Sequence, residues 1–281
     1  MHKTHLVVID PQNSFCKVVD AQEQQVIHDG ELCVPGAWED MECVAQMISR
    51  LGKKLDDIHI TLDSHHQLHI AHPIWWKDSG GTSPVPFTAL SEQSGTIQGS
   101  DGKEYTTYRP SFLKRTLEYL KALSDGKRYP HVIWPPHCLI GTPGHNIVTP
   151  LLTVVLQWER DVFGAADIVT KGSNYFVEHF SAVRAEVIDP QDPTTQLNTA
   201  FVNTVMEADE ILLSGEASSH CLANTVRDMA NEFADDSFIK KCVLLTDGTS
   251  AVPTFENYEQ QFIQEMTSRG MKTTTTVDYL A

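Results

Sequence analysis

The chain has 281 residues and carries 21 Lys and Arg against 37 Asp and Glu, which gives a formal net charge of −16. A surface this negative repels nucleic-acid phosphates and anionic membrane faces, so we expect neither nucleic acid nor a membrane as a partner. The 41% of apolar residues suffices for a sizeable core, whereas no apolar run approaches the roughly 18 residues of a membrane span.

Short apolar runs alternate with amphipathic segments along the chain. Buried strands are predicted at 6–9, 58–62, 132–134, 161–169, 211–213 and 243–245, and helices near 44–51, 222–233 and 255–266. Strands that alternate with helices predict an α/β fold, with a doubly wound, mostly parallel sheet and helices on both faces. Ligands of such sheets bind beyond the carboxyl ends of the strands, so the residues that follow each strand are the candidates for function.

The stretch from about 73 to 130 interrupts this alternation. It is rich in Gly, Ser, Thr and Pro, and only 112–123 shows helical spacing. We predict a single domain over 1–281 with an insertion at 73–130, which narrows access to the site or forms an interface and buries Trp75 and Trp76. A second irregular segment, 173–192, ends in a turn signal.

The start of the chain and its cysteines indicate the compartment. The first residues run directly into the apolar stretch 6–9, which is too short for the core of a signal peptide. The six cysteines are scattered and form no CxxC pair, as is usual for reduced thiols. We therefore expect a cytoplasmic protein.

Asp10 follows the first predicted strand, in VIDPQNSF. A carboxylate at a strand end is a general base, a metal ligand or only a local hydrogen-bond acceptor, and Asp10 alone does not decide among these roles.

Asp63 follows the second predicted strand, and four histidines come directly after it. They are His65, His66, His69 and His72. Imidazole and carboxylate together suit Zn²⁺, Fe²⁺ or Mn²⁺. The cluster therefore favours a metal site, and a solvated histidine cluster or a metal that only stabilises the fold remains the alternative.

Three further candidates follow later strands. His137 comes after two prolines in WPPHC, where the restricted backbone suits a ligand. Lys171 follows the fourth predicted strand. Cys221 lies in the first turn of a helix that follows the fifth predicted strand. Free backbone N–H groups at a helix start favour a thiolate and can hold an oxyanion. Together with Asp10, they make a coherent base, charge partner and nucleophile.

These residues resemble a known family, the isochorismatase-like cysteine hydrolases. VIDPQNSF, the TKG around Lys171 and the GEASSHC that ends at Cys221 are similar to its aspartate, lysine and cysteine motifs. The histidine box after Asp63 and the string WPPHC resemble the metal set of its nicotinamidase branch. The resemblance covers the chain except 73–130 and the segment after Lys171, which are longer than in compact nicotinamidases.

The resemblance implies a six-stranded parallel sheet, the isochorismatase-like hydrolase fold, and a full set of site residues. These are Asp10, Lys171 and Cys221 for catalysis, the backbone N–H groups of Ala217 and Cys221 for the oxyanion after a cis Glu216–Ala217 peptide, Phe15 and Trp134 as walls of the substrate pocket, and Asp63, His65, His69 and His137 as metal ligands. One divalent ion is implied, Zn²⁺ first, with Fe²⁺ or Mn²⁺ as alternatives. Whether His66 or His72 replaces His69 stays open.

The activity implied is the metal-dependent hydrolysis of nicotinamide to nicotinic acid and ammonia through a cysteine thioester, within NAD salvage and pyridine nucleotide biosynthesis. The partners implied are a small-molecule amide and further copies of the chain in a homo-oligomer. An amidase for another small amide is the first alternative. A metallohydrolase with a structural Cys221 and a zinc-stabilised binding module without activity are the others.

Overall fold

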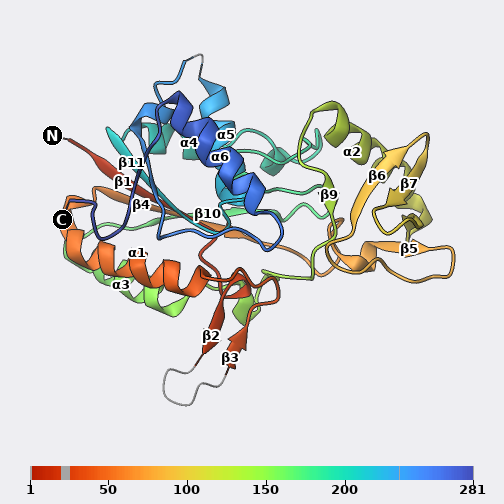
Figure 1. Ribbon diagram of the computed structural model, residues 1–281, viewed down its shortest axis with the longest axis horizontal. Helices are drawn as coiled ribbons and strands as arrows, with labels where there is room; N and C mark the ends of the chain where they lie inside the picture. Colours follow the sequence, from red (N-terminus) through yellow and green to blue (C-terminus); the bar gives the residue numbers. More distant parts are fainter. Residues whose placement is uncertain (1, 20–25, 234, 281) are drawn as a thin grey trace.

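In the computed structural model, residues 2–19, 26–233 and 235–280 are described. They form an α/β structure around a six-stranded sheet in which all neighbouring strands are parallel (Figure 1). The strand order is β10 (Asp167–Lys171), β4 (Asp57–Asp63), β1 (Thr4–Ile9), β11 (Glu210–Gly215), β12 (Cys242–Leu245) and β13 (Lys272–Thr274). The predicted fold class is therefore confirmed.

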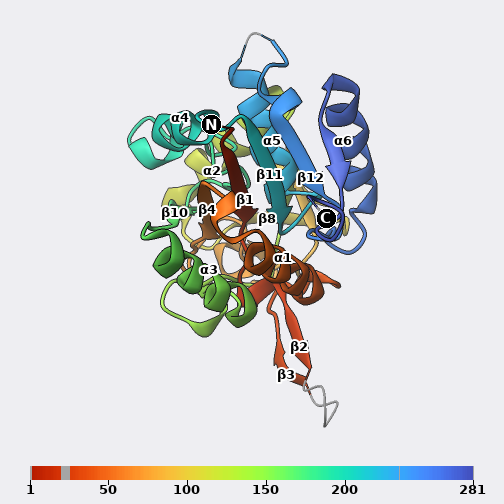
Figure 2. The ribbon, with the colours of Figure 1, turned by 90° about the vertical axis from the view of Figure 1, so that its left-hand side faces the viewer.

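Helices cover both faces of this sheet (Figures 1 and 2). One face carries α1 (Ala37–Leu51) and α3 (Thr149–Val162), and the other carries α4 (Thr199–Met206), α5 (Cys221–Glu232) and α6 (Glu256–Arg269). Every residue of the central strand β1 is buried, as expected for a parallel strand that is covered on both sides. In the described part of the chain, none of the helices combines the length and apolarity that a membrane crossing requires.

The chain winds outward from β1 in both directions. It first adds β4 and β10 on one side of β1 and later β11, β12 and β13 on the other. The order of the strands thus reverses between β1 and β11, and a crevice forms beyond their carboxyl ends. The residues that follow these two strands, Asp10 and the segment up to Cys221, therefore lie beside this crevice.

Two of the predicted strands need correction. The run 132–134 lies outside the main sheet, because β9 (His131–Val132) pairs antiparallel with β6 in a second sheet. The run 161–169 begins in the last turn of α3, and its strand starts only at Asp167. The strand β13 escaped prediction because it is a short, polar edge strand without an apolar run.

The insertion at 73–130 is more regular than its composition indicates. Its strands are β5 (Trp76–Asp78), β6 (Ala89–Gln93), β7 (Thr96–Gly99) and β8 (Glu104–Thr107), which form a five-stranded antiparallel sheet with β9, and α2 (Leu113–Asp125) packs near it. Part of the Gly and Ser content serves its turns: Ser94 and Gly95 both have positive φ, 53° and 86°, in the two-residue turn between β6 and β7.

The prediction for the two tryptophans is confirmed. Trp75 and Trp76 are 1% and 0% exposed, in an apolar cluster that is separate from the core of the main sheet. Trp75 Nε1 donates a hydrogen bond to Thr116 Oγ1 of α2 at 3.2 Å, and Trp76 Nε1 donates one to the Ile70 carbonyl oxygen at 2.6 Å. The insertion thus has a small core of its own, and its assignment to one domain with the main sheet stays a prediction.

Short elements complete the described chain. A hairpin of β2 (Lys17–Val19) and β3 (Val26–Asp29) projects from the body (Figures 1 and 2). The 3₁₀ helices are η1 (Asn13–Phe15), η2 (Gly52–Lys54), η3 (Pro73–Trp75), η4 (Pro110–Phe112), η5 (Pro143–His145), η6 (Pro193–Thr195) and η7 (Ile239–Lys241).

Candidate active site

A small cavity opens beyond the carboxyl ends of β1 and β11, where the strand order reverses. It is lined by Phe15, Leu32, Asp63, Trp134, His137, Glu178, Phe180, Ala217, His220, Cys221 and Val252. Most of these are apolar or aromatic, with a few polar groups among them, as is usual for a site that binds a small organic ligand. Phe15 and Trp134, the predicted walls of the pocket, are both part of the lining.

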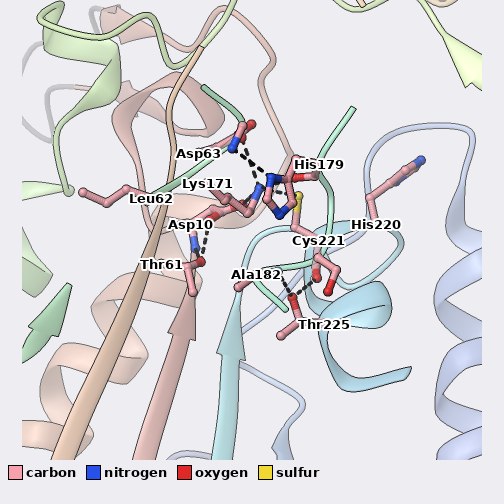
Figure 3. Close-up of polar contacts among 12 residues, drawn as sticks. Asp10, Thr61, Leu62, Asp63, Lys171, His179, Ala182, His220, Cys221 and Thr225 are labelled. Atoms are coloured by element: carbon pink, nitrogen blue, oxygen red, sulfur yellow. Dashed lines mark hydrogen bonds and ion pairs between the residues drawn. The ribbon is translucent and has the colours of Figure 1, made fainter. Parts of the chain in front are cut away.

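The three predicted catalytic side chains meet beside this cavity, and Cys221 is part of its lining (Figure 3). Lys171 Nζ lies 2.8 Å from Asp10 Oδ2 and donates to Cys221 Sγ at 3.6 Å. It also donates to Asp63 Oδ1 at 3.1 Å and to the His179 carbonyl oxygen at 3.0 Å. Because β10 and β11 lie on opposite sides of β1, only the assembled sheet brings these residues together.

Thr61 holds Asp10 in place, and sequence analysis missed this residue. Its Oγ1 donates to Asp10 Oδ1 at 2.5 Å and accepts the Asp10 backbone N–H at 3.0 Å (Figure 3). Thr61 lies on β4, the neighbour of β1, and is fully buried. A polar residue within the predicted strand 58–62 was the available signal, but its partner depends on the pairing of the strands.

The charges around Cys221 do not balance in favour of a thiolate. Burial raises the pKa of the Cys221 thiol well above its usual value; Lys171 opposes this rise, and Asp10 and Asp63 add to it. Burial would lower the pKa of Lys171, but the two carboxylates hold it well above its usual range. The expectation that the helix start favours a thiolate stays a prediction, and burial and the two carboxylates act against it. A base must therefore take the proton as the sulfur reacts.

The two carboxylates that flank Lys171 have opposite shifts. Burial raises the pKa of Asp10, against the attraction of Lys171, which brings this carboxyl closer to the range where it can exchange a proton at neutral pH. Burial alone would also raise the pKa of Asp63, but His65 and Lys171 hold that pKa well below its usual value. Asp10 is thus suited to move a proton, and Asp63 is suited to remain charged.

The loop before Cys221 has the geometry expected for an oxyanion site. The Glu216–Ala217 peptide is cis, as the resemblance implied, and α5 begins at Cys221. The first N–H groups of a helix have no acceptor within the helix. Gly215 has a φ of +106°, and a Cβ at this position would collide with the Ile9 carbonyl oxygen, so β11 can approach β1 here only with glycine.

A pair of buried carboxyl groups lies behind this loop. Burial raises the pKa of Glu216 well above its usual value, and the neighbouring Asp40 adds to the shift. Burial also raises the pKa of Asp40, to about 6. Ser250 Oγ donates to Asp40 Oδ2 at 2.6 Å, and the Ser250 N–H donates to Glu216 Oε2 at 3.4 Å. The loop thus rests on a carboxyl group that favours its neutral form.

Glu216→Gln is expected to stabilise the protein at alkaline pH. Because the folded pKa of Glu216 is raised, its contribution to stability is present below the unfolded pKa, about 4.3, and is lost as the pH rises through the folded pKa. An amide does not ionise, so as the pH rises above about 5 the free energy of unfolding of the variant should fall less than that of the wild type, as measured by urea unfolding. Glu256→Gln, at the exposed start of α6, is the control; equal pH dependence in both variants would contradict this account.

Three of the four predicted metal ligands converge on one point. Asp63 Oδ2 lies 2.8 Å from His65 Nε2 and 3.4 Å from His137 Nε2, and all three side chains are buried. Gly172 makes room for them: its φ is +84°, and a Cβ there would come within 2.7 Å of Asp63 Oδ1. One carboxylate and two imidazoles around one point form a donor set that fits a divalent ion of the Zn²⁺ class.

The histidines of this cluster differ in which ring nitrogen carries the proton and which keeps its lone pair. In three of the histidines, Nδ1 donates to a backbone carbonyl oxygen. His65 donates to Gly172 at 3.2 Å, His72 to Gln67 at 3.1 Å and His137 to Pro135 at 2.9 Å. Their neutral rings therefore keep the lone pair on Nε2, the usual state of a metal-binding histidine. His69 differs, since its Nδ1 accepts the Ala71 N–H at 3.1 Å and its neutral ring then carries the proton on Nε2. Nε2 of His69 and Nε2 of His72 are both buried and have no hydrogen-bond partner among the described residues.

His69 lies within the histidine cluster, whereas His66 lies outside it. The ring of the buried His69 lies 4.4 Å from that of His65, between centroids, so it belongs to the cluster despite its tautomer. His66 is exposed to solvent.

The irregular segment 173–192 supplies residues that sequence analysis did not single out. Glu178 and Phe180 line the cavity, and the Ala182 N–H donates to Thr225 Oγ1 of α5 at 3.0 Å, which fastens the segment beside Cys221 (Figure 3). Burial raises the pKa of Glu178, against the influence of His65, and its Oε2 has no hydrogen-bond partner among the described residues. The only available signal was the position of the segment after a strand end.

His220 forms another part of the wall that was missed. Its ring lies 5.3 Å from Trp134 and 5.3 Å from Phe180, between centroids, and burial lowers its pKa to about 3, so the ring is neutral. From the insertion, Phe87 packs edge-on against Trp134 at 5.7 Å. The cavity lining, within the described chain, comes from outside 73–130. The insertion thus contacts the cavity wall through Phe87, and narrowed access stays a prediction.

Comparisons with known proteins support the same fold. No protein-family model matches the chain, and no curated protein sequence matches it. Among solved structures, the yeast nicotinamidase Pnc1p bound to the inhibitor nicotinaldehyde is similar with a TM-score of 0.61 at 17% identity, over 97% of this chain and 99% of that chain. A nicotinamidase/pyrazinamidase of Acinetobacter baumanii has a TM-score of 0.59 at 19% identity, over 99% of both chains.

A third structure is the pyrazinamidase of Pyrococcus horikoshii in complex with zinc, with a TM-score of 0.52 at 18% identity, over 97% of this chain and 99% of that chain. At these identities the likeness concerns the fold. The chain therefore has the α/β fold that these three structures share.

Proposed function

We propose that this chain, which has the fold of the nicotinamidases, is a metal-dependent amide hydrolase that converts nicotinamide to nicotinic acid and ammonia. One observation carries the proposal: Lys171 Nζ contacts both Asp10 and Cys221, and Cys221 lines a cavity together with Asp63 and His137 of the carboxylate–histidine cluster. A nucleophile, a base and a cation in contact are the parts that acyl transfer through a thioester needs.

The first half of the reaction forms the thioester. Asp10 accepts the proton of Cys221 as the sulfur attacks the amide carbonyl carbon, and Lys171 stabilises the negative charge that develops nearby. The N–H groups of Ala217 and Cys221 donate to the oxyanion of the tetrahedral intermediate. When this intermediate collapses, the C–N bond breaks and Asp10 returns its proton to the leaving nitrogen, which departs as ammonia.

The second half releases the acid. Asp10, again a carboxylate, takes a proton from a water molecule as the water oxygen attacks the thioester carbonyl carbon. The C–S bond then breaks, Cys221 recovers a proton, and the carboxylic acid leaves the cavity. The buried Lys171 stays charged throughout, because both of its carboxylate neighbours raise its pKa.

The metal ligands in this proposal are Asp63, His65 and His137, together with one further histidine. When bound, the ion supplies a Lewis acid for the ring nitrogen of the substrate. Around it, Phe15 and Trp134 offer flat apolar surfaces for an aromatic ring, and the cavity lining continues from His137 to Cys221. We choose His72 over the predicted His69 as the further ligand, because only His72 has its ring proton on Nδ1.

The choice of ligands gives a prediction about metal content. His137→Ala, Asp63→Ala and His72→Ala should each lower the bound Zn²⁺ per chain, because each removes a donor atom, whereas the exposed His66→Ala should not. Equilibrium dialysis followed by mass spectrometry measures this content. His69→Ala is the matched comparison: if it removes the ion and His72→Ala does not, the tautomer argument is wrong.

The substrate is tested by ammonia release from a panel of amides. Nicotinamide and pyrazinamide should react, benzamide should react poorly because it lacks the ring nitrogen, and non-aromatic amides should not react. Efficient turnover of non-aromatic amides alone would instead favour the alternative, an amidase of this fold for another small amide.

The proposed setting of the reaction is NAD salvage in the cytoplasm. The proposed assembly is a homo-oligomer, and light scattering would measure the number of its subunits.

A further inference from the structure

A second group of metal-binding side chains lies at the opposite end of the main sheet, where its strands begin. His5 of β1 and Asp57 and His59 of β4 place their donor atoms within 4.8 Å of one another. The parallel register sets His5 beside Asp57, and it sets Asp167 of β10 beside His59. In Figure 1, β1 starts on the side of the molecule that carries the N-terminus, away from the insertion.

The hydrogen bonds of His59 direct one of its ring nitrogens at this point. Its Nδ1 lies 3.2 Å from Asp167 Oδ2, and because a carboxylate only accepts, Nδ1 carries the proton. The lone pair on Nε2 then faces His5 Nδ1 at 3.1 Å and Asp57 Oδ2 at 3.8 Å. A carboxylate that fixes the far nitrogen of a histidine is the usual outer support of a metal-bound imidazole.

Asp57 also has a carboxylate oxygen available for a ligand. Asp57 Oδ1 accepts the Ile58 N–H at 2.8 Å, which orients the carboxylate and leaves Oδ2 for a ligand. Two ligands at 2.0–2.1 Å from a tetrahedral zinc are about 3.3 Å apart, close to the 3.1 Å between the nitrogens of His5 and His59.

The surroundings favour a cation over a simple hydrogen bond between the two rings. In that arrangement Asp57 Oδ2 lies 3.8 Å from His59 Nε2, too far for a hydrogen bond to it. The carboxylates of Asp56, Asp57 and Asp167 surround two histidines here, in a chain with a net charge of −16. The side chain of Asp57 is 29% exposed while that of His59 is fully buried, so an ion can enter from the Asp57 side and keep a water ligand there.

We propose that His5 Nδ1, Asp57 Oδ2 and His59 Nε2 form a second divalent-cation site of the Zn²⁺ class. It joins the starts of β1 and β4 and is supported by Asp167. The inference goes beyond the proposed function, since His5 lies near the start of β1 and Asp10 follows its end five residues later, a span of about 16 Å. The ion is therefore too far from Cys221 to take part in its chemistry, and its effect is on the stability of the sheet.

The test counts ions. The full chain is dialysed against Zn²⁺, and bound metal per chain is measured by mass spectrometry, with circular dichroism to establish folding. We expect two ions in the wild type, one in His5→Gln, one in Asp57→Asn and one in His137→Ala, which disables only the cavity cluster. The combined His5→Gln, His137→Ala variant should bind none. His2→Gln, at the exposed N-terminal histidine, is the matched control and should keep both ions.

The outcomes separate this site from the proposed function. A wild type with one ion that only His137→Ala removes would overturn the second site. One ion that His5→Gln removes and His137→Ala does not would support the second site and count against the metal in the cavity. Asp167→Asn should bind the second ion about 10–100-fold more weakly, while ammonia release by His5→Gln should equal the wild-type rate. If Asp167→Asn and Asp57→Asn both bind Zn²⁺ as the wild type does, the two histidines form only a hydrogen bond.

Discussion

Cys221→Ala is expected to lower kcat by at least about a thousandfold and to leave the binding of nicotinic acid within a few-fold of the wild type. The variant loses the sulfur that attacks the amide, whereas the metal cluster and the walls of the cavity stay in place. Ammonia release measures the first effect, and titration calorimetry with nicotinic acid measures the second.

A second cysteine variant serves as the control. Cys242 on β12 is as deeply buried as Cys221 but lies away from the cavity lining, so Cys242→Ala should keep its turnover even though it loses a buried thiol. Residual activity of Cys221→Ala within tenfold of the wild type would rule out the thioester. The reaction would then belong to a metal-activated water, with Cys221 in a structural role.

Asp10→Asn is expected to separate turnover from thiol reactivity. Loss of the base should lower kcat by about 10²–10⁴-fold. Because Asp10 raises the pKa of Cys221, its neutral replacement should lower that pKa and speed alkylation by iodoacetamide at neutral pH. Asn retains an oxygen for the hydrogen bond from Thr61 Oγ1, whereas its amide nitrogen replaces the oxygen that faces Lys171 Nζ. Slower alkylation together with slower turnover would indicate a misfolded site.

Lys171→Met is the complementary variant and should impair both properties. It removes the cation that opposes the rise of the Cys221 pKa, so alkylation should slow along with turnover. It also leaves Asp10 and Asp63 buried without their shared partner, at a cost of about 3–5 kcal/mol, which urea unfolding would detect. Alkylation at the wild-type rate in a folded variant would show that Lys171 does not tune the thiol.

Local sequence signals were sufficient for the features that depend on neighbouring residues. The alternation of apolar runs with helical spacing predicts the α/β class because each run must bury itself within its own strand or helix. Asp10, Lys171 and Cys221 could be singled out because each follows a strand, and in a parallel sheet every strand delivers its last residues to the same edge. The burial of Trp75 and Trp76 follows from their apolar area alone.

The tertiary structure decided everything that depends on which strands become neighbours. The segment 131–132 pairs in the second sheet because β6 offers it an antiparallel edge. Thr61 holds Asp10, and His59 meets His5, because β4 pairs with β1 from a distance of about fifty residues along the chain. The sequence carries no local record of such pairing, since register is set by burial across the whole sheet.

The assignment of protons among the histidines is likewise a property of the folded chain. His69 and His72 look alike in the sequence, and only the backbone groups that fold against them, the Ala71 N–H and the Gln67 carbonyl oxygen, give their rings opposite tautomers. Residue type and spacing thus determined which groups could bind a metal. The hydrogen bonds of the assembled backbone decided which lone pairs are free to do so.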